Sequence, residues 1–220
     1  VNDPKRPGVE YGYTFDRLND GIGLVAKQIQ RIIPFLTEFF ARHQIEYRVS
    51  MSIADFEGNQ PAILEKVGLS REEFISRCRS SLMTFGAAFP DIEIELNLFE
   101  EGIVNGDFAT IIQGVRDRMA KGDFGQIQEM VGKEPKNIIS FIAKNSLSFY
   151  KRWFDKPDMS IDEAKDLVLA QGAEYAASGI VWGKYFQDDL VIQIAGDRPK
   201  MQAFNSFESS QPVICCKRVY

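Results

Sequence analysis

The chain has 220 residues, of which 45% are hydrophobic and 26% charged, and its formal net charge is −5. This balance is that of a folded globular protein rather than a disordered one, and the length suits one domain. The acidic charge and the lack of long Lys or Arg runs disfavour nucleic acid as a partner.

The first 19 residues combine prolines and glycines with an aromatic cluster of Tyr11, Tyr13 and Phe15. We expect residues 1–19 to form an N-terminal arm laid over a single domain that spans residues 20–220. Residues 1–8 lack the apolar centre of a secretory signal. No apolar stretch approaches the roughly 20 residues that span a bilayer. We therefore expect a soluble, cytoplasmic protein with no membrane partner.

Asp20 can cap a long helix whose apolar residues, from Leu24 to Phe40, recur at helical spacing. Pro34 is expected to kink that helix or to end its first half. The period then changes to two, which predicts a first strand over residues 47–53. A short helix over residues 62–67 ends at Gly68. A capping box of Ser70 and Glu73 begins a helix to about Gly86, and strict alternation predicts a second strand over residues 92–98.

Residues 107–156 are predicted to be helical, with interruptions at Gly122 and at Glu134–Pro135. A second capping box, Ser160 with Glu163, opens a helix that reaches toward Phe186, and β-like runs follow at residues 190–195 and 212–219. This order predicts an α/β fold, a Rossmann-like three-layer domain with a mostly parallel sheet and a helix-rich middle. The last two runs are expected to pair as an antiparallel edge near the C-terminus.

Several chemistries lack their residues. His43 is the only histidine, H-E-x-x-H is absent, and Cys78, Cys215 and Cys216 form no C-x-x-C pair, so we expect inert thiols and no zinc site. A hydrolase with a histidine base would have to use His43 itself. There is no haem, zinc or P-loop nucleotide signature, which leaves the cofactor unknown and Mg²⁺ as the candidate ion.

Gly21 to Ala26 match G-x-G-x-x-A, the dinucleotide-binding fingerprint. That motif works only when a strand delivers the glycines to the pyrophosphate. Residues 15–20 do not resemble a strand. We interpret the match as a helix start with a small face for close packing.

The end of the first predicted strand carries polar side chains within eight residues: Ser52, Asp55, Glu57 and Asn59. Ligands bind outside the carboxyl ends of strands in open α/β sheets. A hydroxyl, two carboxylates and an amide there can hold a polar ligand or a magnesium-bound phosphate, or exchange protons. The alternative is that Asp55 and Asn59 only cap the next helix while Glu57 is solvated.

Glu100 and Glu101 end the second strand and, if the strands are parallel, project toward the same edge. They can bind a metal or an amine, or they form a solvated turn. Arg77 can reach an anionic group of a substrate, since guanidinium binds carboxylate or phosphate in a bidentate manner. The alternative for Arg77 is a surface ion pair with Glu73, four residues earlier.

Glu174 and Tyr175 lie in the long late helix among small residues. A tyrosine beside a carboxylate can take part in proton transfer, whereas close packing of the helix on the sheet explains the same pattern. The order of strand, serine-containing loop and late helix with tyrosine and glutamate resembles the layout of cyclodipeptide synthases and of the related class I aminoacyl-tRNA synthetase catalytic domain. Class I signature sequences are missing and the spacing around Tyr175 differs, so no residue roles are carried over.

Two functions fit these patterns. The first is a transferase-like enzyme that acts on a small polar or nucleotide-like substrate at the carboxyl edge of the sheet. Its catalytic candidates are Ser52, Asp55, Glu57, Glu174 and Tyr175, and its cofactor-binding candidates are Asn59, Arg77, Glu100 and Glu101. The second is a non-catalytic domain that binds a small molecule or a partner protein.

Overall fold

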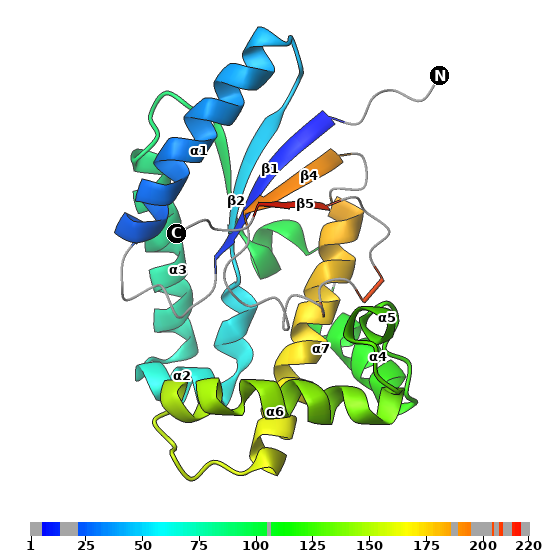
Figure 1. Cartoon of the computed structure of the whole chain (residues 1–220). Coiled ribbons are helices and arrows are strands. Elements are labelled where there is room, and N and C mark those ends of the chain that lie inside the picture. The colour runs from blue at the N-terminus through cyan, green and yellow to red at the C-terminus, as the bar shows by residue number, and fades with distance from the viewer. Residues whose placement is uncertain are drawn as a thin grey trace. The chain divides into compact units, whose positions relative to one another are not determined.

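A computed structural model of the chain describes residues 6–13, 22–104, 107–185, 189–194, 204, 207–208 and 213–216. These residues form a helix-rich α/β protein, as expected (Figure 1).

The chain divides into two compact units: unit 1 is Val1–Asn105, Phe186–Asp197 and Gln211–Tyr220, and unit 2 is Gly106–Tyr185 and Arg198–Ser210. The elements of unit 1 are β1 (Arg6–Tyr13), α1 (Ile22–Arg42), β2 (Arg48–Ile53), η2 (Asp55–Asn59), α2 (Pro61–Val67), α3 (Arg71–Ala87), β3 (Ile94–Leu98), η3 (Phe99–Ile103), β4 (Asp189–Ile194) and β5 (Val213–Cys216). Those of unit 2 are α4 (Phe108–Ala120), α5 (Ile127–Val131), α6 (Pro135–Trp153) and α7 (Ile161–Tyr185).

The strands described in unit 1 form one parallel sheet in the order β3-β2-β1-β4-β5. The register pairs Tyr13 with Ile53 and Ile53 with Leu98, so the carboxyl ends of β1, β2 and β3 are level. The antiparallel edge predicted near the C-terminus is wrong, because β4 and β5 pair in parallel. Residues 195–212 exceed the dozen or so residues that a parallel crossover needs.

Strand β1 lies in the centre of the sheet, between β2 and β4. The arm predicted over residues 1–19 is therefore wrong for residues 6–13. The strand contains Pro7, Gly8 and Gly12. Proline and glycine are typical of turns and weaken an isolated strand. The sequence of residues 6–13 therefore does not indicate a strand. The single domain predicted over residues 20–220 stays a prediction.

The two faces of the sheet differ in character. Side chains alternate along each strand, and residues in register share a face. The apolar face carries Val49, Met51, Ile53, Leu96 and Leu98, and the polar face carries Ser50, Ser52 and Asn97. Helix α3 packs on the apolar face so closely that a Cβ added to Gly86 would lie 2.7 Å from Leu96 Cδ1. Helix α1 contacts α3 and lies on the same side of the sheet (Figure 1).

Both predicted capping boxes are confirmed. Ser70 Oγ accepts the Glu73 N–H at 3.2 Å, and the Glu73 carboxylate accepts the Ser70 N–H at 2.8 Å. Ser160 and Glu163 repeat the arrangement at 3.1 and 2.7 Å. Helix α2 ends at Gly68, whose φ of 65° is the left-handed conformation that glycine adopts without strain.

The predicted interruptions of the long helical region are also confirmed. Helix α4 ends at Ala120, and α6 begins at Pro135. Helix α1 continues through Pro34 as one helix, so the proline does not end its first half.

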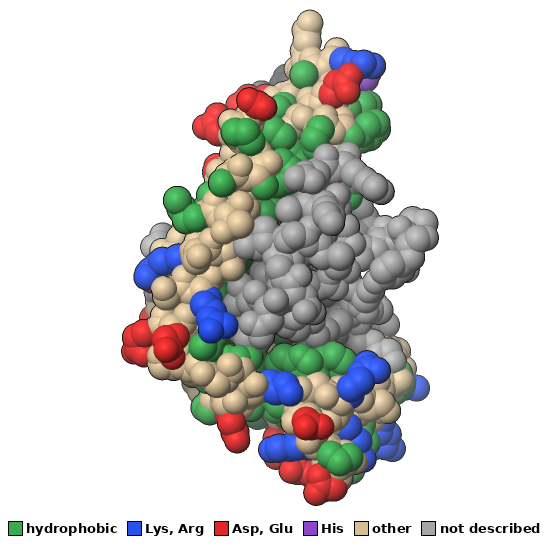
Figure 2. Space-filling view, turned by 90° about the vertical axis from the view of Figure 1, so that its left-hand side faces the viewer, with side chains coloured by type: hydrophobic (Ala, Val, Ile, Leu, Met, Phe, Trp, Pro, Cys, Tyr) green, Lys and Arg blue, Asp and Glu red, His purple; other side chains and the backbone are tan. Residues whose placement is uncertain are grey.

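No helix within the described ranges is long and apolar enough to cross a membrane. Figure 2 shows acidic, basic and hydrophobic side chains interspersed on the face that carries α1 and α3.

A buried hydrogen bond joins α6 to α7 in unit 2. Tyr150 Oη donates to Gln171 Oε1 at 2.9 Å, and both residues are buried. We expect Tyr150→Phe to lower the free energy of unfolding by about 1–3 kcal/mol, because the buried amide oxygen loses its donor. Urea unfolding measures the change. The double variant Tyr150→Phe with Gln171→Met should recover part of the loss, and an unchanged midpoint in the single variant would contradict the prediction.

Candidate functional site

Two short helical segments meet at the carboxyl edge of the sheet in unit 1. Segment η2, a 3₁₀ helix, begins two residues after β2, and η3, a π-helix, follows β3 directly. Because Ile53 and Leu98 are in register, the segments lie beside each other, and the Glu100 N–H donates to Asp55 Oδ1 at 2.7 Å. The sequence-based expectation that these loops share one edge is confirmed.

Asp55 is a buried acid at this edge. Its side chain is 1% exposed, and its Oδ2 is buried without a hydrogen-bond partner among the residues described. Burial raises the pKa of Asp55 from 3.8 to about 6; the N–H of Glu100 lowers it, while the charges of Glu100 and Glu101 raise it. An acid that titrates near neutral pH can both accept and donate a proton under ordinary conditions.

A polar network surrounds the edge. Asn59 Nδ2 donates to Glu100 Oε2 at 2.9 Å, and Arg71 Nε donates to Asn59 Oδ1 at 2.8 Å. Arg71 also forms an ion pair with Glu100 at 3.7 Å, and Arg79 forms one with Glu101. The hydrogen bond from Arg79 holds the pKa of Glu101 below its ordinary value. Helix α3 thus supplies two partly exposed guanidinium groups to this edge.

These contacts contradict the capping alternative for the loop. The N-cap of α2 is Gln60, and no side chain caps that helix. Asp55 instead accepts from Glu100, and Asn59 bridges Glu100 and Arg71. Glu57 is 6% exposed, so it is buried rather than solvated. The acidic loop is therefore part of the tertiary structure and not merely a helix start.

Cys78 of α3 lies close to this loop. Burial raises the pKa of its thiol well above the ordinary range, and the negative charges of Asp55 and Glu57 raise it further. The Cys78 thiol therefore stays protonated at neutral pH. Only the thiolate form of cysteine is an effective nucleophile. This agrees with the expectation of an inert Cys78. Cys215 and Cys216 lie in β5.

Two other predicted residues, Ser52 and Arg77, also belong to unit 1. Ser52 is 1% exposed and lies one position before the carboxyl end of β2, on the polar face. Arg77 is exposed on α3. The sequence reasoning selected Arg77 and passed over Arg71 and Arg79, which bond to the edge. Arg71 and Arg79 are eight residues apart, which places them on one face of the helix. This spacing in the sequence could have identified the pair.

Two buried polar groups on the sheet were not anticipated. Ser50 Oγ and Asn97 Nδ2 are buried and lack hydrogen-bond partners among the described residues. Both lie on the polar face, and Asn97 is in register with Ser52. Strand alternation alone would have assigned them to that face. Such unpaired buried groups require an explanation, which a bound polar ligand or water would supply.

Glu174 and Tyr175 lie on α7 in unit 2, and each unit is described by itself. Glu174 is 4% exposed, and the Tyr175 carbonyl accepts the Ser178 hydroxyl at 2.8 Å. Packing explains the small residues near them, because a Cβ at Gly172 would lie 2.7 Å from Phe204 Cε1. Their catalytic role stays a prediction.

The dinucleotide fingerprint, Gly21 to Ala26, follows β1 in the sequence and runs into α1. A strand does precede it, since β1 ends at Tyr13, but α1 begins at Ile22 and Gly23 is already helical. Residues 14–21, which include Gly21, lie outside the described residues. In the functional motif the strand leads directly into the glycines, so we keep the interpretation of a helix start.

No group of three or more His, Cys, Asp or Glu side chains in the described part of the chain is arranged to hold a metal ion. No protein-family model matches the chain. A search of curated proteins finds no match either. The function must therefore be argued from the site itself.

Proposed function

We propose that the carboxyl edge of the sheet binds a small polar or nucleotide-like substrate and that Asp55 exchanges a proton with it during group transfer. The observation that carries this proposal is the buried carboxyl group of Asp55, with one oxygen unpartnered among the described residues and a pKa of about 6. Acids and bases in enzymes work best with pKa values near the working pH. The Asp55 carboxylate would accept the proton of an attacking hydroxyl or amine as the bond from that nucleophile to the transferred group forms. The bond between the transferred group and its donor breaks in the same step, and the leaving group departs with the bonding electrons and takes up a proton from Asp55 or from water.

The strand order supports a Rossmann-like arrangement of the sheet. In the order β3-β2-β1-β4-β5 the direction of winding reverses between β1 and β4. Ligands of such sheets bind outside the carboxyl ends of the strands at the reversal. Because Tyr13 is in register with Ile53, the loop that carries Asp55 follows the strand next to this point.

The surrounding groups favour a ligand that carries both an anionic group and a hydroxyl or amino group. Arg71 and Arg79 can bind phosphate or carboxylate in a bidentate manner. Glu100 and Glu101 can accept hydrogen bonds from hydroxyl or ammonium groups. Nucleotides and amino acids combine these features, and nucleotides can bind together with Mg²⁺.

A melting-temperature screen of the whole chain with nucleotides, amino acids and Mg²⁺ tests the proposal. A ligand at a hundredfold excess over its Kd should stabilise the protein by about 2.7 kcal/mol. The double variant Arg71→Gln with Arg79→Gln should lose most of that shift, whereas Arg152→Gln, an exposed arginine of α6, should retain it. A full shift in the double variant would contradict the proposed site. No shift with any compound would favour the non-catalytic alternative.

A further inference from the structure

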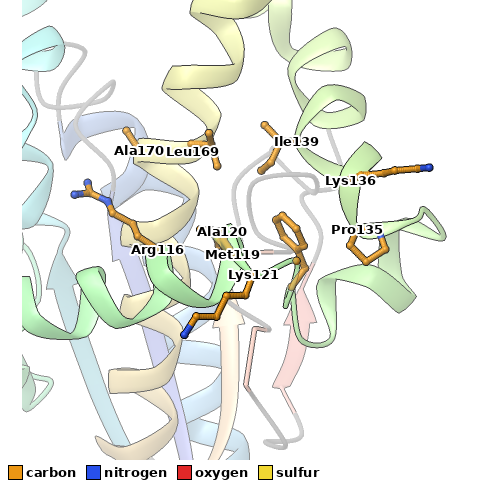
Figure 3. Close-up of a pocket in the computed structure, with 11 residues that line it drawn as sticks. Arg116, Met119, Ala120, Lys121, Pro135, Lys136, Ile139, Leu169 and Ala170 are labelled. Atoms are coloured by element: carbon orange, nitrogen blue, oxygen red, sulfur yellow. The ribbon is translucent and has the colours of Figure 1, made fainter.

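Unit 2 contains a pocket that is separate from the residues of the proposed function. It has a volume of about 790 Å³ and is lined by residues of α4, α6 and α7 and of the loop after α4 (Figure 3). Small-molecule sites commonly enclose 300–1,000 Å³. The volume is therefore sufficient for a ligand of ordinary size.

The middle of the pocket is apolar. Met119 and Phe124 are buried at 6% and 5% exposure, and Ile139 is half-buried. Leu169 lines the same pocket and is 40% exposed. Figure 3 shows Leu169 and Ile139 on one side of the pocket and Met119 on the other. A large apolar side chain exposed inside a concavity favours contact with an apolar ligand.

The rim of the pocket is cationic. Arg116, Lys121 and Lys136 line it, and none of its described lining residues is an aspartate or glutamate. Figure 3 shows the three cationic side chains at the periphery of the apolar centre. No carboxylate of the described residues pairs with any of the three. Among the described residues, therefore, no carboxylate competes with an anion for these three cations.

Helix α6 adds to this positive potential. It begins at Pro135, which lines the pocket, and its first turn carries no acidic residue. The N-cap residue is Glu134, which does not line the pocket and whose side chain makes no capping hydrogen bond. The free N–H groups and the dipole of a helix favour negative charge near its first turn. The cationic rim and the helix start thus attract the same kind of group.

We infer that this pocket binds a small carboxylate with an apolar body, such as a medium-chain fatty acid. The chain contacts the apolar centre, and the carboxylate meets the cationic rim, where charge-assisted hydrogen bonds are stronger than neutral ones. A neutral compound of the same length leaves the cations without a partner. A cationic compound is repelled by them.

Calorimetric titration of the whole chain with decanoate, decan-1-ol and decyltrimethylammonium tests the inference, with the two ionic compounds below their micelle concentrations and decan-1-ol below its solubility limit. Decanoate should bind at least about tenfold more tightly than decan-1-ol because it makes charge-assisted contacts. Decyltrimethylammonium should bind more weakly than both. Equal affinity for decanoate and decan-1-ol would overturn the inference, as would failure of decanoate to bind.

Two variants assign the binding to this pocket. Leu169→Glu places a carboxylate in it and should weaken decanoate binding by more than about tenfold through like-charge repulsion. Met83→Glu is the matched control, since Met83 is a 70% exposed hydrophobic residue of unit 1, and its affinity should equal that of the wild type. Wild-type affinity in Leu169→Glu would overturn the inference.

The triple variant Arg116→Gln, Lys121→Gln, Lys136→Gln decides the result if Leu169→Glu fails to fold. All three residues are exposed, so their substitution leaves the core intact. This variant should bind decanoate and decan-1-ol equally, and a retained preference for decanoate would overturn the inference. Because these residues lie outside the edge that carries Asp55, failure here would leave the proposed function unaffected.

Discussion

Replacing Asp55 by asparagine should make the stability of the protein less dependent on pH. The pKa of Asp55 is raised from 3.8 to about 6, so the folded state holds this proton more tightly than the unfolded state does. Wild-type stability therefore falls as the pH rises between these two values, and the full loss of about 3 kcal/mol is present above the folded pKa. Asparagine does not ionise. The stability of the variant relative to the wild type should thus rise by about that amount between pH 4 and pH 8.

Urea unfolding at pH 4 and pH 8 measures this difference. Asp91→Asn changes an exposed aspartate of the same unit and should keep the wild-type dependence on pH. If Asp55→Asn also keeps that dependence, the raised pKa of Asp55 is wrong.

The same variant also tests the proposed catalytic role. Once the thermal screen has identified a substrate, kcat of Asp55→Asn should fall by about 10²- to 10⁴-fold, the usual contribution of a general acid or base. If Asp55 acts as the base, wild-type activity should rise as the pH increases through about 6. Loss of activity together with relative stabilisation at pH 8 is typical of a functional residue. Full activity would remove Asp55 from the mechanism.

Gly58→Ala should destabilise the protein by about 1–3 kcal/mol, as overpacking of a filled core does. A Cβ at this position would lie 2.7 Å from Phe74 Cδ1, and Phe74 is fully buried at 0% exposure. Because the ring is enclosed in the core, either the ring or η2 must shift. A shift of η2 would displace Asp55 from the Glu100 N–H, and ligand binding at the edge should then weaken as well.

Gly114→Ala is the matched control for this substitution. Gly114 lies inside α4, and an added Cβ there would meet nothing within 4 Å. Alanine should therefore stabilise the helix by about 0.5–1 kcal/mol. Chemical denaturation of the two variants should give changes of opposite sign, and equal stability of the two would contradict the packing argument at Gly58.

Short-range patterns predicted the local elements well. The capping boxes that begin α3 and α7 depend on residues three positions apart, and the end of α2 depends on Gly68 alone. Alternation within β3 likewise needs only five residues. The juxtaposition of Asp55 and Glu100 also followed, because parallel strands bring their carboxyl ends to one edge.

The amino-acid sequence by itself thus determined the helix starts, the α/β class and the acidic edge, since each depends on neighbouring residues or on strand direction. Only the tertiary structure decided that residues 6–13 form the central strand and that β4 and β5 are parallel. It also decided that Asp55 and Asn59 bond to Glu100 instead of capping α2. These features depend on pairing and burial between distant residues, and the pKa of Asp55 depends on the same burial.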